Sequence, residues 1–339
     1  MDVKKIFRGI ALYILGVGLL FLLIITAYFM VFAQVTANPD KVKRLLADSG
    51  LYEKMPAVIY DDAVKSESTA SSSIPLKDQE VRQTALEVFN PGFVQQNIET
   101  VIDGAYGWLE GETDHPEFSV DIQDAKSQFA ASVSEKLGKR LQALPPCTMS
   151  QLRQISNTDD LFSLQCLPPG SDITSMKSQF SNSVANSEEF LKETKITPDT
   201  FKDETGQSLF DSGKDIPQTY QLSKKLPYIL AVIIIIISAL IIFISASRRE
   251  GIIKLIKTFL IAGVFVLLIP LVLNNLADIL LGASADNDVT SQLAKPIINA
   301  FNAEAAKIYY VMGGLYALIA GAGYLVLRRF YPEKKEKRK

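Results

Sequence analysis

The sequence predicts an all-α membrane protein with four transmembrane helices and a mainly helical extracytoplasmic domain between helices 1 and 2. The chain has 339 residues, of which 48% are hydrophobic and 21% are charged. The apolar residues gather in four stretches that lack Asp, Glu, Lys, Arg and His. A helix crosses a hydrocarbon core of about 30 Å with roughly 20 such residues. Basic residues beside these stretches indicate the orientation, and apolar residues at helical spacing indicate the structure of the rest.

The first apolar stretch, residues 10–33, predicts an uncleaved membrane anchor. Its apolar run is longer than that of a cleaved signal peptide. The other predicted transmembrane helices are residues 227–247, 258–277 and 308–327. Backbone groups in lipid must be satisfied within their own segment, so we expect these stretches to be helices.

Basic residues mark one side of the membrane. Residues 1–9, the link 248–257 and the tail 328–339 together contain fourteen Lys and Arg against four Asp and Glu. Positively charged loops remain in the cytoplasm, so both termini are expected there, and residues 34–226 and 278–307 outside the cell membrane. The remaining 21 basic and 33 acidic residues make the outer side negative. That negative charge disfavours nucleic acid as a partner. The lipid bilayer is an expected partner because the four apolar spans lie in it.

Residues 34–226 predict a helical bundle. Apolar stripes at three- and four-residue steps begin after Pro39, after Asn90-Pro91, at Phe129 and at Ile173. Three further segments break this pattern: 117–122 alternates like a strand without an identifiable partner, 65–75 predicts a flexible loop, and 194–220 predicts a looser connection.

The second outer loop, residues 278–307, predicts an amphipathic helix that leads into the fourth span. This helix is expected to lie on the membrane or against the extracytoplasmic domain. The residues of its apolar face are Leu293, Ile297, Ile298, Phe301 and Ala305.

Both cysteines of the chain lie in the extracytoplasmic domain, each beside a Pro-Pro pair. Two cysteines in an oxidising compartment usually pair, so we predict a disulfide between Cys147 and Cys166. Closing a loop of about 20 residues adds on the order of 3 kcal/mol. Within the loop, Thr148 and Gln151 form a capping-box pattern for a short helix through Leu152 and Ile155. A redox-active pair is the alternative, although it favours Cys-x-x-Cys spacing.

Candidates for chemistry are few. The single histidine, His115, lies near Asp114 and Glu117, which makes these three a weak candidate metal site, or a solvated acidic turn. The chain has no recognisable catalytic or nucleotide-binding motif, so we expect neither an enzyme nor a cofactor. The spans contain no ionisable residue, which disfavours a secondary transporter.

The fourth span contains small residues at four-residue steps. Gly313, Ala317 and Gly321 permit a close helix approach. This approach serves either packing within the chain's own bundle or a homodimer through transmembrane helix 4.

Four segments carry a resemblance to other proteins: LADSGLYEKMP, WLEGETD, LPPC and CLPP, placed between one span and three more. This combination resembles a group of uncharacterised bacterial four-span membrane proteins. The group has no established activity to carry over. The layout alone is also similar to the permeases of macrolide-export and cell-division ABC systems, and that likeness implies a separate cytoplasmic ATPase. Ectodomains of those permeases mix strands and helices, whereas residues 34–226 are predicted to be mainly helical.

The expected function is therefore that of a non-enzymatic envelope scaffold or interaction protein. It would act through residues 34–226 on another envelope protein or polymer. The alternatives are the permease-like subunit with its ATPase, and a membrane-bound hydrolase or metal enzyme at His115.

Overall fold

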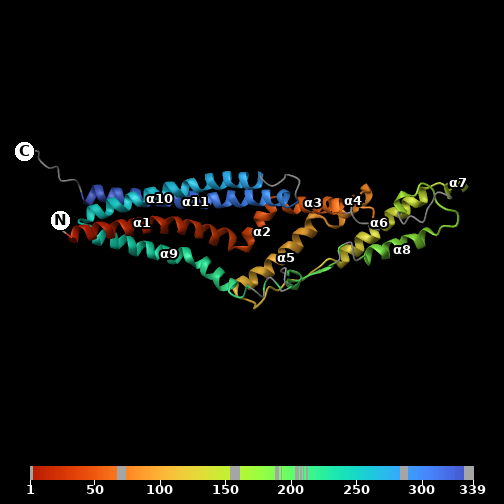
Figure 1. The fold of residues 1–339 in the computed structure, drawn as a ribbon, viewed down its shortest axis with the longest axis horizontal. Helices are drawn as coiled ribbons and strands as arrows, with labels where there is room; N and C mark the ends of the chain where they lie inside the picture. Colours follow the sequence, from red (N-terminus) through yellow and green to blue (C-terminus); the bar gives the residue numbers. More distant parts are fainter. Residues whose placement is uncertain are drawn as a thin grey trace, which may run out of the picture. The chain divides into compact units, whose positions relative to one another are not determined.

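The computed structural model of the chain (Figure 1) describes residues 3–66, 74–152, 161–187, 213–282 and 289–331, with 191, 193–202, 206, 208 and 210. The chain divides into two compact units. The first unit comprises Met1–Leu45, Asp215–Asp286 and Lys295–Lys339. The second unit comprises Leu46–Lys214 and Asn287–Ala294.

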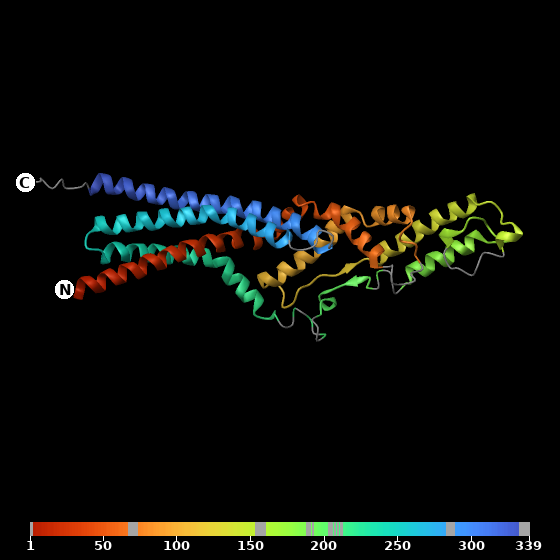
Figure 2. The same ribbon diagram turned by 45° about the horizontal axis from the view of Figure 1, so that its top comes forward.

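Four long helices build the first unit. They are α1 (Val3–Val31), which continues as the π-helix η1 (Phe32–Thr36), α9 (Ile216–Ile244), α10 (Arg248–Gly282) and α11 (Val289–Phe330). Within the described residues, all four are long and apolar enough to cross a membrane. The prediction of a helical protein with four candidate membrane spans is confirmed. Figures 1 and 2 show α10 and α11, in blue, running side by side.

The helices extend beyond the predicted spans. Residues 248–257, predicted as a link, are the first turns of α10, and residues 245–247 make the connection to α9. This connection brings the start of α10 so close to α9 that a Cβ at Gly251 would lie 2.7 Å from the Cα of Ile242. Within the predicted outer loop 278–307, residues 278–282 belong to α10 and residues 289–307 to α11. Its predicted amphipathic helix belongs to α11, which is continuous from Val289 to Phe330.

A hydrogen-bonded contact joins the end of α1 to the start of α9. The Tyr220 hydroxyl donates to the carbonyl of Ala37 over 3.2 Å, and the Tyr220 ring packs edge-on against Phe32 at 6.0 Å. The chain then restarts as α2 (Pro39–Asp48), where the Asn38 side chain accepts a bond from the Lys41 amide. The apolar stripe predicted after Pro39 therefore begins a separate helix.

Short helices and two minimal strands make up the second unit. They are α3 (Leu51–Ser66), α4 (Gln79–Val88), α5 (Pro91–Glu110), β1 (Val120–Asp121), α6 (Gln123–Ala143), α7 (Met149–Leu152), η3 (Leu161–Ser163), α8 (Ile173–Ala185), β2 (Lys195–Ile196) and η4 (Pro198–Thr200). The α5 helix begins at an Asn90 cap followed by proline and ends at Gly111, whose φ of 79° suits glycine. Most of the predicted loop 65–75, residues 67–73, lies outside the described residues.

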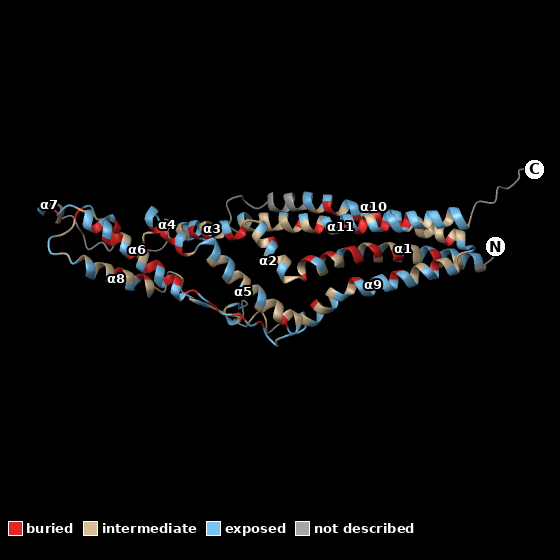
Figure 3. Cartoon of the chain, turned by 180° about the vertical axis from the view of Figure 1, so that it is seen from behind, coloured by how far each residue is buried: buried red, intermediate tan, exposed pale blue. Residues whose placement is uncertain are grey.

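Helix α6 supplies the centre of the core in the second unit. Figure 3 shows its buried residues in red, and Phe129, Leu137 and Leu141 are fully enclosed. Val81 and Ala85 of α4 and Phe180 and Val184 of α8 belong to the same apolar cluster. The apolar stripes predicted from helical spacing at Phe129 and Ile173 therefore form one core.

The strand predicted at 117–122 is reduced to β1, and its partner is β2. They pair antiparallel, with Val120 opposite Ile196. Residues 195–196 of the segment 194–220, predicted as a looser connection, are therefore held by hydrogen bonds to β1. Two of its phenylalanines, Phe201 and Phe210, also pack with Trp108 and Phe118 at ring distances between 5.7 and 6.5 Å.

Candidate functional site

Helices α6 and α8 form the frame that supports the disulfide. The Ser134 hydroxyl of α6 donates to the carbonyl of Lys177 in α8 over 2.8 Å, and Lys177 forms an ion pair with Glu135. A hydrogen bond from Lys177 and its charge lower the pKa of the Glu135 carboxyl. Gly138 lies against the Lys177 side chain, which would have to shift if a Cβ were added there. These contacts hold the two helices together at Lys177.

A buried lysine fastens the residues after α8 to the start of α6. Lys126 is 3% exposed, and its Nζ donates to the carbonyl of Ser187 over 2.6 Å and to that of Leu191 over 3.4 Å. Burial lowers the pKa of its ammonium group. The two carbonyls compensate for part of the hydration that this charge loses.

Aromatic and charged contacts seat η3 against the same frame. The buried ring of Phe162 lies 5.7 Å from the Phe180 ring of α8. On the Phe162 ring lies the guanidinium of Arg140, which also pairs with Asp78 at 3.0 Å. The segment between the two cysteines is therefore attached to α6, α8 and the cap of α4.

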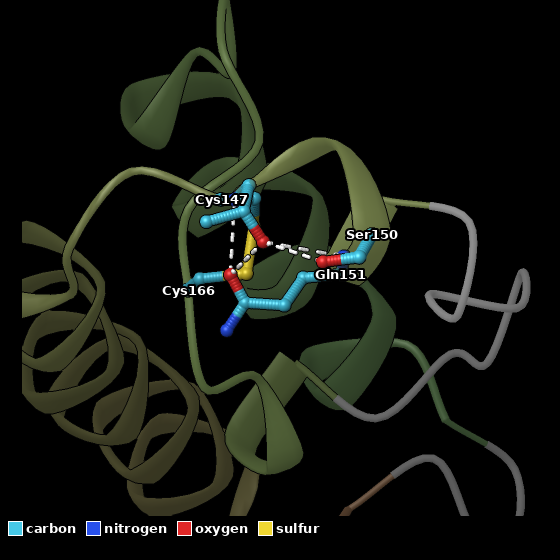
Figure 4. Close-up of a disulfide and its surroundings, with 5 residues drawn as sticks. Cys147, Ser150, Gln151 and Cys166 are labelled. Atoms are coloured by element: carbon cyan, nitrogen blue, oxygen red, sulfur yellow. Dashed lines mark hydrogen bonds between the residues drawn. A yellow bond between two sulfur atoms is a disulfide. The ribbon is translucent and has the colours of Figure 1, made fainter.

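The predicted disulfide is present between Cys147 and Cys166 (Figure 4), with an S–S distance of 2.06 Å and a Cα–Cα distance of 4.8 Å. Two backbone hydrogen bonds flank it. The Cys147 amide donates to the Leu167 carbonyl over 3.0 Å, and the Leu167 amide donates to the Pro145 carbonyl over 2.9 Å. The prolines beside the cysteines have fixed φ angles and lack an amide hydrogen, which limits the conformations of this bridge.

Helix α7 follows the disulfide directly and is capped as predicted. Gln151 Oε1 accepts bonds from the Thr148 amide over 2.9 Å and from the Thr148 hydroxyl over 2.8 Å. Ser150 Oγ lies 3.1 Å from the same hydroxyl (Figure 4). The side chain of Met149 on this turn is 79% exposed. The continuation predicted through Ile155 lies outside the described residues.

The weak metal candidate receives no support. Asp114, His115 and Glu117 all lie exposed in the turn after α5. Across the described ranges, no group of three or more His, Cys, Asp or Glu is placed to hold a metal ion.

The small residues of α11 divide into two environments. Gly313 is buried against α10, where a Cβ would lie 2.6 Å from the Leu267 side chain and 3.2 Å from the Gly263 carbonyl oxygen. Ala317 lies next along the same contact, with its amide 3.8 Å from a Cβ built at Gly263. A Cβ at Gly321 would meet nothing within 4 Å. Close packing at Gly313 is therefore internal to the chain.

Sequence reasoning missed a cavity within the first unit. It has a volume of about 650 Å³, and α1, α9, α10 and α11 all line it. No local sequence signal marks it, because it depends on the spacing between four separate helices.

Comparison of the chain with protein-family models, with curated proteins and with solved structures gave no match.

Proposed function

We propose that the chain is a multi-pass protein of the bacterial cell membrane that binds another envelope component through its disulfide-closed turn. Residues 34–226 face the outside in this proposal, and both termini face the cytoplasm. The contact surface is the turn formed by the disulfide and α7. We refer to this surface, residues 145–152 with 164–169, as the disulfide tip.

Charge and cysteine use support the orientation. The segments 1–9, 248–257 and 328–339 contain fourteen of the 35 basic residues but four of the 37 acidic ones. Such an excess holds short segments in the cytoplasm. Disulfides persist in oxidising compartments, and the geometry of Cys147 and Cys166 suits a bond. Both features favour the same placement of residues 34–226.

The main observation in support of the proposed contact is that Met149 is exposed on a turn whose backbone is held by the disulfide and the capping box. A methionine that is 79% exposed cannot contribute much to the stability of its own domain. Thioether side chains are adaptable and recur at binding surfaces. Ordering the turn beforehand by a disulfide and a capping box lowers the entropy cost of association. The disulfide tip thus has the properties of a preformed contact surface.

The experiment places a photo-crosslinking amino acid at Met149 in the full chain and irradiates intact cells. We expect a covalent adduct with an envelope protein or polymer, and its loss in the Cys147→Ser/Cys166→Ser variant. The matched control places the same amino acid at Gln95, an exposed position of α5. Equal adducts at both positions, or none at Met149, would remove the support for a contact through the disulfide tip.

The permease-like alternative is tested in the same cells. A photo-crosslinker at Lys257, exposed near the start of α10, should capture no ATPase under the proposed function. Recovery of an ABC-type ATPase there would instead support the permease-like subunit.

A further inference from the structure

We propose that the cavity among α1, α9, α10 and α11 is a binding groove for the hydrocarbon chain of one membrane lipid. The cavity lies entirely within the first unit and within the four candidate spans. Its volume of about 650 Å³ is in the range of ligand-binding pockets, which is about 300–1,000 Å³. Because the spans lie in hydrocarbon, an occupant enters from the bilayer.

The walls of the groove present hydrocarbon. None of the described residues that line it is charged. Two of its hydroxyl groups already donate to carbonyls of α1: Thr26 to Leu22 over 2.7 Å and Tyr316 to Leu23 over 2.8 Å. The Ser238 hydroxyl is buried and has no hydrogen-bond partner among the described residues, although a rotation would direct it to its own helix. The groove therefore accepts an apolar chain and leaves a polar headgroup outside.

The length of the groove follows from the helices that line it. It extends along α9 from Pro227 to Ile242 and along α11 from Met312 to Val326. At 1.5 Å per residue, these segments are about 22 Å and about 21 Å long. Each leaflet contributes about half of a 30 Å core, so the groove continues past the middle of the bilayer.

The groove is long and narrow, which suits an extended hydrocarbon chain. A volume of about 650 Å³ spread over about 22 Å gives a mean cross-section of about 30 Å². A helix with its side chains is about 10–12 Å across, which corresponds to a cross-section of about 80–110 Å². An extended hydrocarbon chain therefore fits this space more closely than a helix does.

Contact with four helices distinguishes this groove from the ordinary lipid-facing surface. Ile234, Phe259, Met312 and Ala320 are buried residues that contribute to its wall. Phe243 and Leu318, by contrast, are 87% and 73% exposed on the outside of the helices. Dispersion contacts are weak singly and add up with the number of neighbouring atoms. A chain in the groove should therefore exchange more slowly than one on the outer surface.

The test uses the purified full chain in bilayer discs of phosphatidylethanolamine and phosphatidylglycerol that contain a phospholipid with a diazirine in its acyl chain. After irradiation, the labelled residues are identified by mass spectrometry. We expect labelling of Ser238, Phe259 and Met312 above that of Phe243 and Leu318. Native mass spectrometry after detergent exchange should also show one retained phospholipid per chain.

Two matched variants test the location. Ala231 and Ala239 are both exposed on α9, but only Ala231 lines the groove. Ala231→Phe should reduce groove labelling to the level of the outer surface and release the retained lipid, while Ala239→Phe should leave both unchanged. Thermal unfolding of each variant checks that both fold. Even labelling over all apolar residues of the spans, or an unchanged retained lipid in Ala231→Phe, would overturn the proposal. Crosslinks between copies through the groove would overturn it as well.

Discussion

The phenolic hydroxyl of Tyr316 donates a hydrogen bond to the main-chain carbonyl of Leu23 over 2.8 Å, joining the fourth candidate span to the first. Their positions are 293 residues apart in the chain. Tyr316 is 3% exposed and also packs edge-on against Phe259 of α10 at 6.0 Å. This side chain therefore connects three of the four long helices.

The Tyr316 contact predicts a modest loss of stability when its hydroxyl is removed. Tyr316→Phe keeps the ring and deletes the bond, and such bonds in membrane helices contribute about 0.6 kcal/mol on average. Thermal unfolding in detergent should show a lower midpoint for Tyr316→Phe. Tyr324→Phe is the matched control, because Tyr324 is 56% exposed on the same helix. Equal midpoints for the two variants would show that the Tyr316 bond contributes nothing measurable.

Gly313 and Gly321 should respond differently to an added methyl group. In Gly313→Ala the new Cβ would lie 2.6 Å from Leu267. Overpacking of this kind should lower the stability of the fold by about 1–3 kcal/mol. At Gly321 the space is open, so Gly321→Ala should be neutral or slightly stabilising. Thermal unfolding measures both. A change of oligomeric state in Gly321→Ala, seen by light scattering, would support the alternative of a homodimer through the fourth span.

Tyr52 gives a prediction that involves pH. Its ring is 1% exposed, and its hydroxyl has no hydrogen-bond partner in the described part of the chain. Leaving such a group unsatisfied costs about 1–3 kcal/mol, so Tyr52→Phe should be neutral or stabilising by up to that amount. Chemical unfolding at pH 7 measures the change. A clear destabilisation would mean that the hydroxyl has a partner that matters.

The pH dependence at Tyr52 has a definite sign. Burial, assisted by the negative charge of Glu99, raises the pKa of Tyr52 from 10.0 to about 12. A folded-state pKa above the unfolded value means that the neutral phenol contributes its stability below pH 10. That contribution is lost as the pH rises through about 12. The wild-type chain should therefore lose more stability between pH 9 and pH 11.5 than Tyr52→Phe does. Identical losses would contradict this assignment.

The disulfide should stabilise the second unit. Cys147 and Cys166 are 19 residues apart, and closing a loop of this size contributes on the order of 3 kcal/mol. The Cys147→Ser/Cys166→Ser variant should show faster hydrogen exchange at the amides of α7 and at the amides of residues 147 and 167, which form the backbone hydrogen bonds beside the disulfide. Exchange in α9, which belongs to the first unit, serves as the internal control. Unchanged exchange throughout would mean that the remaining contacts hold the turn without the bond.

The spans and the disulfide were predictable because their signals are local or unambiguous. An uncharged apolar run of about 20 residues has one stable solution in a bilayer. Two cysteines in one domain allow a single pairing. Asn90-Pro91 similarly fixes the start of α5, because the asparagine caps the helix and the proline suits its first turn. Residues 248–257, predicted as a cytoplasmic link, are helical, because charged residues at a membrane edge mark a side and do not end a helix.

Other features depend on contacts between distant residues. The two-residue strand β2 pairs with β1 across more than 70 residues, and neither strand is long enough to show a pattern by itself. The ring contact between Phe210 and Trp108 likewise joins residues that are far apart in the chain. Helix α4 was missed although Asp78 caps it and Val81, Ala85 and Val88 have helical spacing. The groove has no sequence signature, because its shape depends on how four helices pack.

We propose that the disulfide forms on the outer side of the cell membrane, and this placement can be measured directly. Because the chain contains two cysteines, the native protein serves as its own reporter. Intact cells are treated with a membrane-impermeant phosphine or left untreated, then exposed to a maleimide attached to a large polymer, and the protein is resolved by gel mobility. We expect no shift without the phosphine and a shift by two added polymers after it. A shift without reduction, or one that appears only after the membrane is permeabilised, would contradict this placement of the disulfide.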